Sequence, residues 1–97
     1  MNITYHVDDI TKKLFDNALT TWGEESQLGQ VQEECAELIV AINKYKRQLP
    51  VDVIDEIADV FIMCVQAARI FGDDEVNKRI HHKLNRLDAS LKERVCS

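Results

Sequence analysis

Residues 53–70 carry apolar side chains in nearly every direction around a helix, and this feature most constrains how the 97-residue chain can fold. A helix that is apolar on all sides is usually buried on all sides. So short a chain offers little to cover it, because small domains bury only about 60% of the surface of the unfolded chain. We therefore expect a second subunit to cover part of this helix.

Helix-breaking residues are few, namely Pro50 and the glycines at positions 23, 29 and 72. They divide the chain into four predicted helices, at about Asp9–Trp22, Glu25–Arg47, Val51–Phe71 and Asp74–Arg94. No alternating pattern typical of strands competes with them. The sequence thus predicts an all-α fold with one domain over residues 1–97, a four-helix subunit whose bundle is completed by homo-oligomerisation.

Four acidic residues, Asp52, Asp55, Glu56 and Asp59, interrupt the apolar stretch VDVIDEIADVFIMC at residues 51–64. We expect Asp52 and Asp55 near the start of the helix, where the macrodipole favours negative charge. Glu56 and Asp59 share a helix face that is otherwise mostly apolar. Burying an ionised carboxylate costs several kcal/mol, so these two acids need to take up a proton, pair with Lys or Arg, or share a cation.

The preceding helix carries a matching pair, Glu34 and Glu37, at the same spacing of three residues. The short connection at residues 48–50 favours antiparallel packing, which would bring the two pairs together as a cage of four carboxylates. Such an all-oxygen site suits Mg²⁺ or Mn²⁺. The alternative is that these are ordinary solvated acids on helix surfaces.

The net charge of −5 is unevenly distributed along the chain. Residues 1–75 hold six Lys/Arg and fifteen Asp/Glu, whereas residues 76–97 hold six and two. An acidic body argues against binding to a nucleic-acid polymer. No long apolar run or signal peptide is evident, so we expect a cytoplasmic protein without a membrane partner. Cys35, Cys64 and Cys96 are interpreted as free thiols, the first two in the core.

The stretch LGQVQEECAELIVAI, followed by DEIADVFIMCVQAARI, resembles the MazG-like family of the all-α nucleoside triphosphate pyrophosphohydrolase superfamily. The similarity extends to WGEESQL upstream and KLNRL downstream. It implies dimers or dimers of dimers, and Mg²⁺ held by Glu34, Glu37, Glu56 and Asp59. It also implies cleavage of a nucleoside triphosphate into the monophosphate and pyrophosphate.

The remaining candidate site residues follow from this hypothesis. Glu37 and Glu33 are candidates to orient or deprotonate the attacking water. Lys83 and Arg86 are candidates to bind the triphosphate, or they belong to a solvated face. The set is completed by Gln27 and Gln30, for a metal-bound water or the nucleotide, and by Trp22, for stacking on the base or for packing.

A second hypothesis is a catalytically silent helical module that retains the fold for oligomerisation or regulation. The two differ in their response to Mg²⁺, which would stabilise only a protein that binds it. The sequence leaves open the base, the sugar, the choice between a canonical and a modified nucleotide, the number of metal ions, and dimer against tetramer.

Overall fold

The computed structural model of the protein describes residues 7–96, and the side chains of residues 7–94. It contains the four helices α1 (Asp9–Trp22), α2 (Glu24–Lys46), α3 (Val53–Phe71) and α4 (Asp73–Cys96). No strand occurs among residues 7–96, so the predicted all-α class and helix order are confirmed. The predicted boundaries differ from these by at most two residues at each end.

The ends of the helices follow from local chemistry that the sequence displays. Asp8 caps α1 by accepting a hydrogen bond of 2.7 Å from the backbone N–H of Thr11. Gly23 ends α1 with φ at +87°, and Gly72 ends α3 with φ at +126°. Side chains with a Cβ rarely adopt this left-handed region, which explains glycine at both positions.

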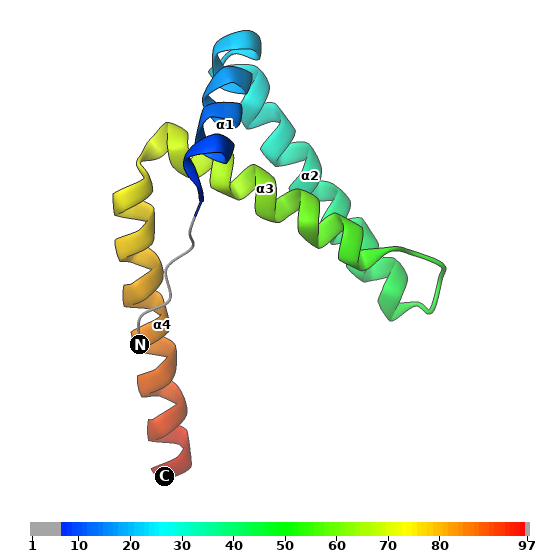
Figure 1. The fold of residues 1–97 in the computed structure, drawn as a ribbon. Coiled ribbons are helices and arrows are strands. Elements are labelled where there is room, and N and C mark those ends of the chain that lie inside the picture. Colours follow the sequence, from blue (N-terminus) through cyan, green and yellow to red (C-terminus); the bar gives the residue numbers. More distant parts are fainter. Residues whose placement is uncertain (1–6, 97) are drawn as a thin grey trace.

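The two central helices, α2 and α3, form an antiparallel hairpin and lie side by side along most of their length (Figure 1). Residues 47–52 connect them. The turn opens with Gln48, which has φ at +61°, and with a hydrogen bond of 2.9 Å from the backbone N–H of Leu49 to the carbonyl of Lys44. The hairpin therefore has the antiparallel geometry expected from the short connection.

The other two helices pack less extensively. α1 lies against α2 and α3, whereas α4 contacts only α3 within the described part of the chain and runs away from the hairpin (Figure 1). Arg69 joins these elements near the end of α3. Its guanidinium donates two hydrogen bonds of 2.9 and 2.8 Å to Asp16 of α1, and one of 2.7 Å to Asp73 of α4. This network fixes the junction of three helices.

The described residues of a single subunit form almost no hydrophobic core. Among the described side chains, only Gln27, Ala41 and Ala68 are buried. Ile54 on α3 is 81% exposed, and Phe61 is 67% exposed. The radius of gyration is 16.5 Å, against about 13 Å for a compact domain of this length. The expectation that α3 is buried on all sides is therefore not met within one chain.

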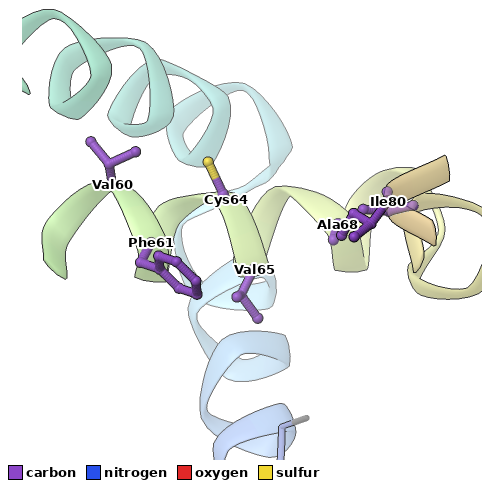
Figure 2. Close-up of a pocket in the computed structure, with 7 residues that line it drawn as sticks. Val60, Phe61, Cys64, Val65, Ala68 and Ile80 are labelled. Carbon is purple, nitrogen blue, oxygen red and sulfur yellow. The ribbon is translucent and has the colours of Figure 1, made fainter. Parts of the chain in front are cut away.

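An apolar pocket of about 230 Å³ lies between α3 and α4 (Figure 2). All its lining residues are apolar or weakly polar: Val60, Phe61, Cys64, Val65, Ala68, Val76 and Ile80. Within the described part of the chain, the pocket leaves part of α3 without a neighbour.

The prediction that Cys35 and Cys64 both lie in the core is wrong for Cys64. Cys35 and Cys64 are free, as predicted, but only Cys35 is half-buried and Cys64 is exposed. The reason is that Cys64 lines the apolar pocket beside α3, which no other described side chain fills. The side chain of Cys96 lies outside the described residues.

The length and hydropathy of the described helices can be compared with what a membrane-spanning helix requires. None of those within residues 7–96 combines the length and the apolar character that crossing a bilayer requires.

Candidate metal centre

Three carboxylates converge where α2 and α3 face each other. Glu34 of α2 and Glu56 and Asp59 of α3 each offer one oxygen, and these three oxygens lie within 4.8 Å of one another. All three residues are half-buried. Glu37 adjoins the group, since its charge acts on both Glu34 and Glu56, but its side chain is exposed. The structure thus brings together three of the four predicted ligands and places the fourth beside them.

Two oxygens of this cluster lack a hydrogen-bond partner. Glu34 Oε2 and Glu56 Oε2 are both buried, and neither accepts a hydrogen bond. A buried carboxylate oxygen is normally hydrogen-bonded, because desolvation without compensation is unfavourable. A divalent cation between the helices would coordinate both oxygens. The donor set therefore fits a hard cation with oxygen ligands.

The clustering of acids also changes their proton affinity. Desolvation, followed by the charges of Glu37 and Asp59, raises the pKa of Glu34 to about 7. A hydrogen bond with the Glu37 carboxyl further favours the protonated form of Glu34 and so raises its pKa. The pKa of Glu56 is raised by the same three causes, with desolvation again the largest. The site without a cation therefore stores charge repulsion that a cation would relieve.

One pocket opens beside the carboxylates. It has a volume of about 350 Å³ and is lined by Glu33, Ala36, Glu37, Val40, Ala41, Lys44, Val51 and Glu56. Both candidate proton acceptors, Glu33 and Glu37, therefore share a pocket with a metal-ligand candidate. Lys44 was not predicted to be a site residue. It could have been found, because it follows Glu37 by seven residues and so lies on the same helix face.

A second pocket lies on the other side of the carboxylates. It has a volume of about 400 Å³ and is lined by Trp22, Ser26, Gln27, Gln30, Met63 and Gln66. The structure therefore brings the substrate-binding candidates Trp22, Gln27 and Gln30 to one pocket. Met63 and Gln66 were missed, although they follow Asp59 by four and seven residues and continue its helix face.

A family model, described as the MazG nucleotide pyrophosphohydrolase domain, matches residues 23–90. This match covers more than half of the chain. The chain belongs to the MazG family. Searches of curated proteins and of solved structures returned no match. The matched region contains all four candidate ligands of the metal centre and begins one residue after Trp22.

The basic candidates of the MazG domain stand apart from its carboxylates. Lys83 and Arg86 are exposed on α4, and α4 makes no contact with α2 in the described chain. α4 also runs away from the hairpin that carries the acids (Figure 1). Within one subunit, the structure does not bring these two side chains to the metal centre.

The remaining acids of the apolar stretch have local roles in the MazG fold. Asp52 caps α3, since its carboxylate accepts a hydrogen bond of 3.1 Å from the backbone N–H of Asp55. Asp55 is exposed in the first turn of the helix. The predicted division of the four acids is therefore confirmed: two lie at the helix start, and two enter the carboxylate cluster.

We expect the metal-free protein to lose stability as the pH rises from about 4.5 to about 7. The pKa of Glu34 is about 7 in the folded chain and has an ordinary value of 4.5, so the folded state binds more protons in this window. Glu34 thus disfavours folding once it ionises. Urea unfolding at a series of pH values in the presence of a chelator measures the slope. In Glu34→Gln this slope should flatten, and an unchanged slope would assign the effect to other groups.

Proposed function

We propose that the protein is a divalent-metal-dependent nucleoside triphosphate pyrophosphohydrolase, which converts an NTP or dNTP into the monophosphate and pyrophosphate. One observation carries the proposal: in a MazG-family chain, three carboxylates converge, and two of them, Glu34 and Glu56, each have a buried oxygen without a hydrogen-bond partner. The whole chain, residues 1–97, acts as one domain in this proposal.

Glu34, Glu56 and Asp59 would hold the cation, and Glu37 is the fourth ligand or a neighbour that remains free. Mg²⁺ is the preferred ion, with Mn²⁺ as an alternative, because all the donors are carboxylate oxygens. When bound, such an ion neutralises phosphate oxygens and lowers the pKa of a coordinated water. The protein contributes the positions of the carboxylates, which two packed helices keep rigid.

Water attacks the α-phosphorus, and the bond from the α-phosphorus to the oxygen that bridges to the β-phosphate breaks, so that pyrophosphate leaves. The water gives up a proton, for which Glu37 and Glu33 are the candidate acceptors. Both line the pocket beside Glu56 and are exposed to solvent. Because Glu37 adjoins the cluster, it is the better placed of the two to receive the proton at a carboxylate oxygen.

The triphosphate also needs cationic side chains that bind its phosphate oxygens. Lys44 lines the pocket that contains Glu37 and Glu56 and is a candidate for this role within the subunit. Lys83 and Arg86 would act from a second copy of the chain, since α4 does not contact α2 of its own subunit. The proposal therefore includes a homo-oligomer, a dimer or a tetramer, in which another subunit covers the exposed face of α3.

The nucleoside would occupy the pocket formed by Trp22, Gln27 and Gln30. Trp22 is 65% exposed, which leaves its indole face accessible for stacking on a base. The two glutamines lie on the same face of α2 as Glu34, so they could bond the nucleotide or a metal-bound water. This arrangement would place the base on one side of the carboxylates and the phosphates over them.

Pyrophosphate release from a panel of canonical and modified NTPs and dNTPs, with and without Mg²⁺, tests the proposal. We expect release from at least one nucleotide that depends on Mg²⁺. Thermal melts provide the comparison with a silent helical module: ligand at 100 times its Kd should stabilise the folded state by about 2.7 kcal/mol. Absence of both release and Mg²⁺-dependent stabilisation would favour the silent module.

A further inference from the structure

The pocket beyond the carboxylates is polar without being charged. Three of its six lining residues are glutamines, and the others are Trp22, Ser26 and Met63. Gln27 and Gln30 extend from α2, while Gln66 extends from α3, so carboxamides line the pocket from both helices of the hairpin. A pocket of this composition suits a neutral group with donors and acceptors at its edge, and it offers no partner to a phosphate's charge.

Two of the three glutamines that line this pocket are largely or partly buried. Gln27 lines the pocket although it is only 6% exposed. Gln66 is half-buried, whereas most glutamines are exposed. A ligand in the pocket would form hydrogen bonds with carboxamides that are only partly in contact with water.

The position along the hairpin agrees with the size of a nucleoside. Gln30 precedes Glu34 by four residues on α2, and Met63 follows Asp59 by four residues on α3. One helical turn, or about 6 Å, therefore separates the near edge of the pocket from the carboxylates. In a nucleotide, a pentose with its 5′ carbon separates the base from the α-phosphate. A triphosphate over the acids would thus extend its base toward this pocket.

We infer that Gln66 is a specificity-determining residue, whose carboxamide hydrogen-bonds the edge of the nucleobase from α3 while Gln27 and Gln30 approach it from α2. The inference rests on the proposed function, because it assigns the pocket to the base of the same substrate. Trp22 and Met63 offer the apolar surfaces on which the faces of the base pack. Each carboxamide has a donor beside an acceptor, which matches the paired donor and acceptor groups of base edges.

Fluorescence of the single tryptophan, Trp22, gives a test that requires neither metal nor hydrolysis. Purified protein comprising residues 1–97 is titrated with the four common nucleoside 5′-monophosphates without Mg²⁺, and quenching yields a Kd for each. We expect the wild type to prefer one base. Gln66→Met keeps the length and the helix propensity of the side chain. In this variant the ratio of Kd values between the other bases and the preferred base should fall about three- to tenfold, because one hydrogen bond to the base is lost.

Gln32→Met is the matched control, because Gln32 is exposed on α2 and does not line the pocket. It should retain the wild-type preference. An unchanged preference in Gln66→Met, or no quenching of the wild type by any of the four, would overturn the inference. If circular dichroism shows that Gln66→Met is not helical, the titration is carried out with Gln66→Glu instead. This variant keeps the shape but loses the donor, and an unaltered order of preference there would also overturn the inference.

Pyrophosphate release, measured in parallel on the same preparations with Mg²⁺, separates this inference from the proposed function. Release without selective quenching would support hydrolysis and reject the role of Gln66. Selective quenching that depends on Gln66, without release from any triphosphate, would support a base-binding pocket and reject the hydrolytic activity.

Discussion

Glu56→Gln is expected to lower Mg²⁺-dependent pyrophosphate release by about 100-fold or more. Mutations around metal sites and of groups that stabilise charge in the transition state typically lower activity by a factor of this size. Glu56 contributes one of the three converging oxygens, and its Oε2 is buried without a hydrogen-bond partner. An amide oxygen is a much weaker ligand for a hard cation than a carboxylate. Steady-state rates of pyrophosphate release at several Mg²⁺ concentrations measure the loss.

The same variant should remain folded, which distinguishes a functional loss from unfolding. The pKa of Glu56 is raised by desolvation and by the charges of Glu37 and Asp59, so its ionised form is disfavoured in the folded chain. A neutral amide removes that repulsion. In a chelator, Glu56→Gln should therefore melt at or above the temperature of the wild type, and it should lose the stabilisation that Mg²⁺ gives the wild type.

Asp55→Asn is the matched control for this experiment. It removes a carboxylate from the adjacent position, but Asp55 is exposed and lies outside the converging group. Its activity and Mg²⁺ response should stay near those of the wild type. Full activity in Glu56→Gln would exclude Glu56 from the metal site, and equal losses in both variants would indicate a general effect of negative charge rather than coordination.

Local rules were sufficient to predict the helices and their ends. Gly23 and Gly72 end helices through the backbone conformations that glycine permits, and Asp52 caps α3, all within a few residues of sequence. The convergence of Glu34 with Glu56 and Asp59 needed one non-local assumption, an antiparallel hairpin. The short connection supplied it, because few other geometries allow two long helices to be joined by so few residues.

Features that depend on distant parts of the chain were not predictable in this way. Arg69 bonds Asp16, 53 residues earlier, and nothing in the pattern around either residue selects the other. The same guanidinium bonds Asp73, the first residue of α4. The sequence pattern of α4 is consistent with packing against any apolar surface, so periodicity alone did not reveal that Lys83 and Arg86 would lie away from the acids of their own subunit.

The residues that line the pocket at Trp22 were also only partly predictable from the sequence. Trp22, Gln27 and Gln30 were selected for their chemistry and for their position near Glu34, whereas Met63 and Gln66 were interpreted as part of an apolar helix or not considered. Once the hairpin register is known, residues on α3 that continue the face of Asp59 lie opposite those on α2 that continue the face of Glu34. The register, which is a tertiary property, therefore decides which side chains share a pocket.

Phe61→Asp is expected to weaken the proposed homo-oligomer by roughly 100- to 10,000-fold. Phe61 is 67% exposed in the single subunit and borders the apolar pocket between α3 and α4 (Figure 2). Burying such a side chain contributes about 1.5–3 kcal/mol, and a two-fold symmetric interface contains it twice. The introduced charge adds a desolvation penalty. Sedimentation equilibrium at several protein concentrations measures the change in the association constant.

Loss of assembly should be accompanied by loss of structure and activity. Only three described side chains are buried in one subunit, so a dissociated chain has little to offset its conformational entropy. We expect Phe61→Asp at micromolar concentration to show reduced helical circular dichroism and no pyrophosphate release. Phe61→Leu, which keeps an apolar side chain, should remain assembled and active. A wild type that is monomeric and folded, or a Phe61→Asp variant of unchanged mass, would contradict the covering of α3 by a second subunit.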